Sequence, residues 1–406
     1  MHSYQITKCR LCGSSSLQEI LALGDTPAGD LYKSNQSDSQ KLNRYPLDCN
    51  ICCNCGHVQL SYFVDPNEIY SEYIYKTSDS LGLDLHFDAF SKDLVDYSNS
   101  ISKKNLFEMG CNDGTLLHYF QKLGFETLGI DPAEIPVKEA RNKGLHVIES
   151  YFDKSMVSKV KEIMPIIDVI IANNVIANVE DLNSVFDGFV ELLSDDGFIV
   201  FETGYLRYLV EMKVIDNVHH EHIDYFAITP LAKFFERKGL YIDRVIISES
   251  KGSSIRVFVR KGKPDNMPKE VRDICDQEVA SGYFEKSTYE QLGIDIALEG
   301  KRLQEFIAAA RKMDVLVIGY GAAIGTTTLL ATFGLEQEMD FLVDDNLRRL
   351  GKFSPGTGIE VKSFDELREL TCAVIIFAWR YQDAIKVKIG ENHRVEAITS
   401  IWSQSQ

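Results

Sequence analysis

A short glycine-containing stretch, Glu108-Met109-Gly110-Cys111-Asn112-Asp113-Gly114, constrains the fold of this chain more than any other feature. It follows an apolar run that ends at Leu106-Phe107 and precedes a helix-like segment, Thr115 to Leu123. A strand, a glycine turn and a helix open the nucleotide-binding unit of α/β folds, where the glycines let a ligand approach the backbone and the helix N-terminus faces it. The stretch therefore predicts an α/β domain built around it.

An acidic residue follows at a characteristic distance. The run Thr127-Leu128-Gly129-Ile130 ends at Asp131, 17 residues after Gly114. A carboxylate at about this distance binds ribose hydroxyls in such folds. E-x-G-x-N-D-G followed by G-I-D-P differs from the dinucleotide pattern and resembles the S-adenosylmethionine (SAM) loop of class I methyltransferases. The alternative is an ordinary α/β turn with an acid at a strand end.

Length and charge limit the classes of function. A chain of 406 residues exceeds what one hydrophobic core usually supports, so we expect two or three domains. No apolar run reaches membrane-spanning length and the start of the chain has no signal-peptide pattern, which predicts a cytoplasmic protein without a membrane partner. A net charge of -17 argues against general nucleic-acid binding and leaves room for one anionic small ligand.

Four cysteines near the N-terminus form two pairs. They are Cys9, Cys12, Cys52 and Cys55. Each C-x-x-C turn aims two sulfurs at one point, which predicts four thiolates around a tetrahedral, structural Zn²⁺ ion. Cys49 and Cys53 are alternative ligands, and buried free thiols are the alternative to a metal. The polar segment 33–43 between the pairs is expected as a mobile loop.

Three tyrosines occur within six residues, at Tyr70, Tyr73 and Tyr75. One phenol is expected in the active site, and aromatic packing at a domain joint is the alternative. Leu81 to Tyr97 has the apolar spacing of a helix that packs on the nucleotide-binding sheet.

Two apolar runs, residues 166–172 and 197–202, extend the predicted sheet, and each ends in polar residues, including Asn174 after the first. The alternation of strands and helices predicts a doubly wound sheet from about Asn105 to Arg260, which binds its ligand at the carboxyl ends of the strands.

A histidine-rich element, His219-His220-Glu221-His222, follows this sheet region. Adjacent residues cannot all face one ion and H-E-x-x-H is absent, so a metal site is the weaker interpretation. An imidazole takes up a proton near neutral pH and a carboxylate can orient it, which favours proton transfer. Exposed loop histidines without a chemical role are the third interpretation.

The last third repeats the strand–loop–helix pattern. After the helix-rich segment 268–313, a strand leads into Gly319-Tyr320-Gly321-Ala322-Ala323, which predicts a second Rossmann-like unit. A purely structural domain is the alternative to a ligand site there. The expected division is 1-80 for a zinc-binding module, 81-262 for a SAM-binding methyltransferase domain and 263-406 for a C-terminal Rossmann-like domain.

In order and in kind these features resemble the three-domain nucleotide-sugar C-methyltransferases of deoxysugar pathways, similar to the dTDP-keto-sugar C-3 methyltransferases. The resemblance covers essentially the whole chain. Besides the motifs above, it rests on Gly56-His57-Val58-Gln59-Leu60, Asn174-Val175, Lys251-Gly252-Ser253-Ser254-Ile255-Arg256, Gly351-Lys352 and Pro355-Gly356-Thr357.

The resemblance implies a reaction and its residues. A base removes the proton beside the ketone of a nucleotide-linked 4-keto-6-deoxy sugar, and the enolate carbon attacks the SAM methyl group. His222 matches the base and Glu221 its neighbouring carboxylate. Tyr75 matches a tyrosine of the approach segment, with Tyr73 as the alternative if the register differs. His219 stands where the family often has tyrosine, and we expect it to donate to the developing enolate oxygen or the sugar.

Binding residues follow from the same motifs. SAM contacts are expected from Glu108, Gly110, Asn112, Asp113, Gly114, Asp131 and Asn174. Contacts to the substrate, held by the C-terminal domain, are expected from Tyr73, Arg256, Tyr320, Gly321, Ala322, Lys352 and Arg380.

Besides His219, two further departures from the family pattern bear on the substrate. Asn178 stands where the family has histidine, and Ile324-Gly325-Thr326 stands where it has Ala-Lys-Gly. These departures leave the sugar, its nucleotide and the methylated carbon open. The sequence also leaves the oligomeric state open, with a monomer among the alternatives. Sugar O-methylation, keto-sugar epimerisation and non-catalytic binding are the competing functions, and the last has no need of a base such as His222.

Overall fold

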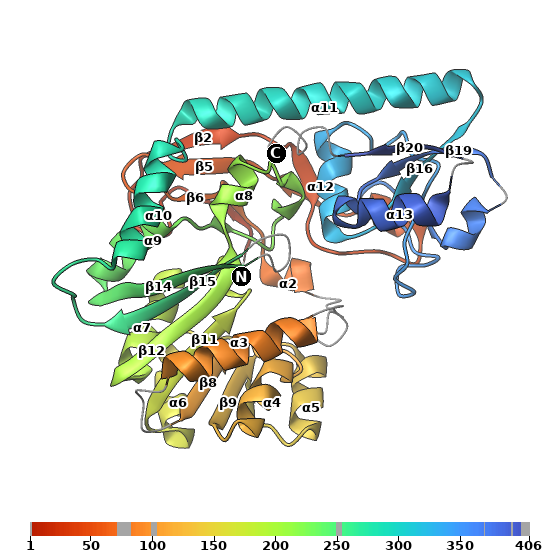
Figure 1. Ribbon diagram of the computed structural model, residues 1–406. Helices are drawn as coiled ribbons and strands as arrows, with labels where there is room; N and C mark the ends of the chain where they lie inside the picture. Colours follow the sequence, from red (N-terminus) through yellow and green to blue (C-terminus); the bar gives the residue numbers. More distant parts are fainter. Residues whose placement is uncertain are drawn as a thin grey trace.

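The chain forms three sheet-centred parts joined by helices (Figure 1). The computed structural model describes residues 2–70, 83–98, 104–248, 254–368, 370–390 and 393–398. Tyr73 and Tyr75 lie outside the described residues. The predicted α/β class is confirmed, because two of the parts have mainly parallel sheets with helices on their faces. The domain limits at 1-80, 81-262 and 263-406 stay a prediction.

The N-terminal part consists of short antiparallel strands. Its largest sheet has the order β13-β6-β5-β2, and β13 comes from much later in the chain than its neighbours. The elements are β1 (Tyr4–Gln5), β2 (Leu17–Leu21), β3 (Asp25–Pro27), α1 (Gln36–Gln40), β4 (Arg44–Pro46), β5 (Cys49–Cys52), β6 (Val58–Leu60), β7 (Tyr62–Phe63), α2 (Pro66–Tyr70) and β13 (Asp224–Tyr225).

The segment expected as a mobile loop, residues 33–43, contains the docked helix α1. The Asn35 side chain caps it by accepting a hydrogen bond from the amide of Ser37 at 2.8 Å. Gln36 donates to the carbonyl of Gly358 at 3.0 Å, so the helix lies against a distant turn of the C-terminal part. The loop prediction was wrong because local composition does not reveal a partner so far along the chain.

A seven-stranded sheet forms the middle part, in the order β10-β9-β8-β11-β12-β15-β14. The strands run parallel except β15, which is antiparallel to both neighbours. The strands are β8 (Asn105–Met109), β9 (Glu126–Asp131), β10 (Val147–Glu149), β11 (Ile167–Asn173), β12 (Leu193–Gly204), β14 (Leu240–Ser248) and β15 (Ser254–Lys261). The helical segments are α3 (Leu83–Tyr97), α4 (Thr115–Lys122), α5 (Glu134–Asn142), η3 (Lys154–Met156), α6 (Val157–Ile163), η4 (Ile176–Asn178), α7 (Leu182–Leu192), α8 (Leu206–Val210), η5 (Ile215–Asn217) and α9 (Ile228–Arg237).

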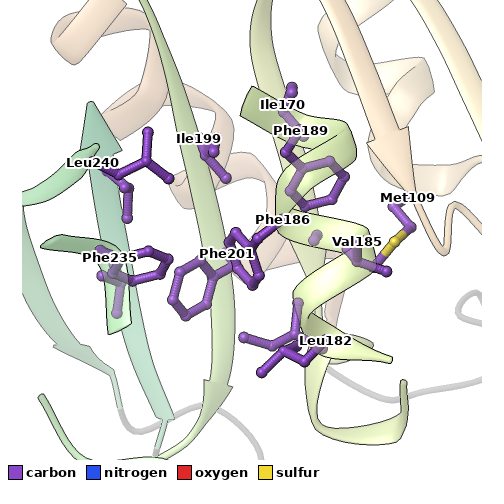
Figure 2. Packing of buried hydrophobic residues seen from close by; sticks show 14 of the residues in the cluster. Met109, Ile170, Leu182, Val185, Phe186, Phe189, Ile199, Phe201, Phe235 and Leu240 are labelled. Atoms are coloured by element: carbon purple, nitrogen blue, oxygen red, sulfur yellow. The ribbon is translucent and has the colours of Figure 1, made fainter. Parts of the chain in front are cut away.

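Aromatic packing fixes one face of this sheet. Phe186 of α7 is fully buried, and its ring lies 5.1 Å from that of Phe235 and 6.1 Å from that of Phe201 (centroid to centroid). Figure 2 shows α7 laid over the sheet, with Phe189 and Leu182 on the same buried side. The continuous apolar run at 166–172 is thereby explained, because β11 is covered on both faces.

The C-terminal part has a five-stranded parallel sheet in the order β18-β17-β16-β19-β20. The long helix α11 passes from the N-terminal sheet to this one (Figure 1). Among the described residues, no helix combines the length and the apolar character needed to cross a membrane. The elements are α10 (Lys269–Ala280), α11 (Lys286–Lys312), β16 (Leu316–Tyr320), α12 (Ile324–Thr332), β17 (Phe341–Val343), β18 (Val361–Lys362), η7 (Phe364–Leu367), β19 (Cys372–Ile376), η8 (Trp379–Tyr381), α13 (Gln382–Ile389) and β20 (Arg394–Ala397).

Candidate active site and metal centre

The two cysteine turns converge on one point. The sulfurs of Cys9 and Cys55 lie 3.6 Å apart and those of Cys12 and Cys52 lie 3.5 Å apart, so each close contact joins one cysteine from each turn. All four sulfurs lie within 4.8 Å of one another. Zn–S bonds of about 2.3 Å in a tetrahedron place sulfurs roughly 3.8 Å apart, so this donor set fits Zn²⁺.

The ligand register is the predicted one. Cys49 is fully buried away from the cluster and Cys53 is exposed, so neither competes as a ligand. Within the described ranges, the four cysteines are the one group of at least three His, Cys, Asp or Glu side chains arranged to hold a metal ion. The metal interpretation of the histidine-rich element therefore has no geometric support.

The loop between β8 and α4 requires glycine at two positions. Gly110 and Gly114 both have φ of 72°, in the left-handed region. A Cβ at Gly110 would lie 2.9 Å from a methyl group of Val175, and one at Gly114 would lie 2.3 Å from a methyl group of Leu145. Asn112 has φ of 49° and completes a tight turn whose backbone lies close to the helix N-terminus.

Asp131 holds this loop from the end of β9. Its two carboxylate oxygens accept hydrogen bonds from the amides of Asn112 and Ala133, each at 2.9 Å. Burial raises the pKa of Asp131, and the two amides act in the opposite direction. The predicted ribose-binding acid is thus placed beside the glycine loop.

Two other acids predicted to bind SAM differ in their surroundings. Asp113 accepts hydrogen bonds from the hydroxyl of Thr115 at 2.7 Å and from its amide at 3.2 Å, so its carboxylate is held against the first residue of α4. Glu108 is 3% exposed, and its Oε2 has no hydrogen-bond partner within the described part of the chain. Burial, followed by the nearby charges of Asp131 and Asp113, raises the pKa of Glu108 well above its ordinary value. An unpartnered buried acceptor next to this loop fits a ligand with donor groups.

A polar network lies at the carboxyl end of strand β12, which pairs with β11 and β15 in the same sheet. Glu202 accepts hydrogen bonds from Arg256 at 3.0 and 3.1 Å, and its other oxygen lies 2.8 Å from Nε2 of His86. Arg256 also donates to Asp93 at 2.8 Å, so its predicted substrate contact must coexist with two acidic partners. His86 was not predictable as a site residue, because it is a single histidine in a helical pattern and its partner Glu202 is distant in sequence.

The His-Glu-His segment (residues 219–222) lies between η5 and β13, where the three parts meet. The amide of His222 donates to the carbonyl of His219 at 2.9 Å, and this turn brings the two ring centroids within 4.0 Å. His219 and His220 are 8% and 2% exposed, so the interpretation as exposed loop histidines was wrong. Nδ1 of His222 lies 3.3 Å from the carbonyl oxygen of Asn217, which favours the tautomer with Nδ1 protonated and Nε2 basic.

Burial changes the protonation of this segment. It lowers the pKa of His219 well below its ordinary value, with further contributions from the charges of His222 and His220, so His219 is neutral at neutral pH. Burial also disfavours the charged form of Glu221, and this raises the pKa of its carboxyl group to about 7. Nδ1 of His219 is buried without a partner among the described residues, so the ring has hydrogen-bonding capacity to offer a ligand.

The C-terminal loop after β16 is also closely packed. The hydroxyl of Tyr320 donates to Asp345 at 3.1 Å and accepts from Lys388 at 3.0 Å. Gly321 has φ of 108°, and the amide of Ala322 donates to Asp344 at 2.6 Å. The structure thus brings Tyr320, Gly321 and Ala322 together at the carboxyl end of β16.

Arg380 reaches the middle part. Its guanidinium donates to Asp216 in η5 at 2.9 Å, and the indole N–H of Trp379 donates to the same oxygen at 3.1 Å. Thr328 of α12 donates to the carbonyl of Val218 at 2.7 Å. Side chains of the C-terminal part therefore hydrogen-bond to residues just before the His-Glu-His segment. Lys352 lies half-buried in the segment before β18.

Three family descriptions match the chain in succession. A zinc binding domain covers residues 9–70, a methyltransferase domain covers residues 87–245 and a C-methyltransferase C-terminal domain covers residues 249–397. The three matches follow one another along the chain, and together they describe a methyltransferase with a zinc binding domain and a C-methyltransferase C-terminal domain. This methyltransferase uses SAM, and its N-terminal part carries the cysteine site for a structural zinc ion.

Individual proteins are similar to the whole chain or to parts of it. The chain is 26% identical to C-methyltransferase NovU of Streptomyces niveus over 383 residues, 94% of this chain and 91% of that protein. It is 24% identical to a ubiquinone biosynthesis O-methyltransferase of Nitrobacter winogradskyi over 157 residues, 36% of this chain and 59% of that protein. Among solved structures, magnesium protoporphyrin IX methyltransferase ChlM from Synechocystis with bound SAM is 14% identical over 45% of this chain and 81% of its own, with a TM-score of 0.35.

Proposed function

We propose that this methyltransferase transfers a methyl group to the carbon beside the ketone of a nucleotide-linked 4-keto-6-deoxy sugar, in deoxysugar biosynthesis. The proposal rests mainly on one observation. A turn sets the ring centroids of His219 and His222 4.0 Å apart, in a segment that contacts all three parts of the molecule. Removing a carbon-bound proton requires a positioned base, and imidazole has a pKa suited to that task. The chain is 26% identical to a protein named a C-methyltransferase over 94% of its length, which supports the proposal.

SAM is proposed to lie over Gly110 to Gly114, with its ribose hydroxyls on Asp131 and its amino group near Glu108. When bound, it supplies an electrophilic methyl group. Asn174, with φ of 53° at the end of β11, is proposed to complete the site from the neighbouring strand. Since the carboxylate of Asp113 already accepts hydrogen bonds from Thr115, its contribution is proposed to come through the loop backbone.

His222 is proposed to accept the proton from the carbon beside the ketone through Nε2. The electron pair of the broken C–H bond then forms the enolate, whose carbon bonds to the methyl carbon as the methyl–sulfur bond breaks. Because Nδ1 of His222 faces the carbonyl of Asn217, the ring is held in the basic tautomer, and the imidazolium that forms keeps this hydrogen bond.

His219 is proposed to stabilise the charge that develops on the ketone oxygen. Its low pKa keeps the ring neutral, so it donates an N–H without placing a permanent positive charge beside the base. Glu221, whose pKa is near 7, is proposed as the neighbouring carboxylate of the base. Tyr75 is assigned to this site by the family resemblance alone.

The C-terminal part is proposed to bind the nucleotide. Gly321 and Ala322 follow a parallel strand, at the edge where open α/β sheets bind ligands. Tyr320, Lys352, Arg256 and Arg380 are proposed to line the substrate path, with Arg380 acting through its contact with Asp216.

The test uses SAM with a ¹³C-labelled methyl group and a panel of nucleotide-linked 4-keto-6-deoxy sugars. We expect one member of the panel to give a product in which NMR shows the labelled carbon bonded to a ring carbon beside the ketone. A labelled methyl group on oxygen would establish sugar O-methylation instead. Absence of transfer to every member would refute the proposed substrate class.

A further inference from the structure

A buried ionic cluster joins the zinc-binding cysteine turns to the strand that follows the His-Glu-His segment. Asp224 stands two residues after His222, and its side chain is completely buried. Its two oxygens each lie 3.0 Å from Nε of Arg10, and one lies 2.8 Å from Nε2 of His57. A carboxylate so far from water depends on these partners for compensation of its charge.

Both partners belong to the cysteine turns. Arg10 lies between Cys9 and Cys12, and His57 stands two residues after Cys55. The guanidinium of Arg10 also donates to the carbonyls of Val179, and of Glu180 at 2.8 Å, beyond η4. Arg10 therefore connects the metal-binding turn to the middle part as well as to Asp224.

Backbone pairing fixes the same region. Asp224 lies opposite Gln59 in the antiparallel pair of β13 and β6. Between His222 and Asp224, the carbonyl of Ile223 accepts from the amide of Leu60 at 2.8 Å and its amide donates to the carbonyl of Ala177 at 2.7 Å. The residue next to the proposed base is thus held by the N-terminal sheet on one side and by η4 on the other.

We propose that the zinc-binding turns position the catalytic base: Arg10 and His57 fix Asp224, and β13 in turn fixes the backbone that carries His222. Arg10, His57 and Asp224 are positioning residues and do not touch the substrate. The inference rests on the proposed role of His222, and it gives the zinc a part in catalysis beyond stabilising its own module.

The first test replaces the buried carboxylate in the full-length, zinc-loaded enzyme. Asp224→Asn keeps the shape of the side chain and removes its charge. We expect kcat per SAM-binding site to fall at least tenfold, while KM for SAM and the zinc content stay at the wild-type level. A variant that merely unfolds in part loses SAM-binding sites and activity together, so normalising kcat to these sites separates positioning from stability.

Graded changes at Arg10 keep the inference testable if Asp224→Asn does not fold. Arg10→Lys retains a charge without the planar fork, and Arg10→Met removes the charge. We expect kcat per SAM-binding site to decrease in the order wild type, Arg10→Lys, Arg10→Met. Arg302→Lys is the matched control, because Arg302 also donates to a buried acid, Glu299, but lies on α11. It should lower stability and leave kcat unchanged.

The outcomes separate this inference from the proposed base. Wild-type kcat in Asp224→Asn, or in both Arg10 variants, would overturn the positioning role even if His222→Asn is inactive. A low kcat in Asp224→Asn together with a near-normal kcat in His222→Asn would overturn the assignment of the base and leave the positioning of this segment standing.

Discussion

Asp131 both shapes the glycine loop and faces the proposed ribose site. Asp131→Ala should weaken SAM binding by about 1.5–3 kcal/mol, the range for hydrogen bonds to a charged group. Isothermal titration calorimetry measures the SAM affinity of both proteins directly. Asp153→Ala is the control, since Asp153 also accepts a backbone hydrogen bond, from Ser155 at 2.7 Å, but at η3. Equal SAM affinity in Asp131→Ala and wild type would show that the acid does not contact the cofactor.

His220 makes stability depend on pH. Burial lowers its pKa to about 4, against about 6.5 in an unfolded chain, although the carbonyls of Tyr45 and Pro46 accept from its ring and Asp25 favours its charged form. Between these values the unfolded state binds more protons, so the free energy of unfolding decreases as the pH falls from about 6.5 towards 4.

Replacing this histidine should therefore flatten the pH dependence. His220→Gln should remove on the order of 3 kcal/mol of the loss between pH 6.5 and 4, and part of the slope should persist because burial also lowers the pKa of His219. Urea denaturation at several pH values measures the slope. An unchanged slope in the variant would show that His220 has the same pKa in the folded and unfolded states, against the effect of burial.

At the residue scale, the sequence predicted groups that are close in the chain. The cysteine pairs identify the zinc ligands because each pair forms its own turn, and the glycine loop 108–114 beside Asp131 was predictable because strand, turn and helix are local. The sequence did not predict the contact of Glu202 with His86, or that of Asp224 with Arg10 and His57, because each joins residues from distant segments. Burial of His219 and His220 was missed for the same reason.

At the scale of elements, α12 and η5 pack too closely for a side chain at Gly325. A Cβ there would lie 2.6 Å from the carbonyl oxygen of Asp216, which is backbone and cannot rotate away. Gly325→Ala should destabilise the protein by about 1–3 kcal/mol, the usual cost of overpacking. Gly293→Ala in α11 has open space and should be neutral or stabilising. Equal thermal stabilities of the two variants would contradict this packing.

The strands and most helices were predictable because their apolar periodicity is continuous. The helix α1 within residues 33–43 was not, since its sequence is polar and its contacts lie at Gly356 and Gly358. β13 was also not predictable: two residues, Asp224 and Tyr225, form a strand only because β6 offers an edge to pair with.

At the scale of the whole molecule, the three parts should differ in their response to metal loss. The free energy of zinc binding to a cysteine site contributes to the folding free energy of the part that contains it. Chelation should therefore loosen the N-terminal sheet first. Hydrogen exchange should show loss of protection in β2 and β5 before β16 and β19. Purified protein never exposed to chelator should contain one zinc ion per chain. Well under one zinc, or equal loss of protection in both sheets, would contradict a structural zinc site.

The central claim is that His222 removes a carbon-bound proton from the sugar. Solvent deuterium exchange at the carbon beside the ketone tests it most directly, with the accepted nucleotide sugar and S-adenosylhomocysteine in place of SAM. The wild-type enzyme should incorporate deuterium, and His222→Asn should lower both this exchange and kcat by about 10²–10⁴-fold, the usual contribution of a positioned base, with SAM affinity unchanged. Exchange at the wild-type rate in His222→Asn would contradict the account.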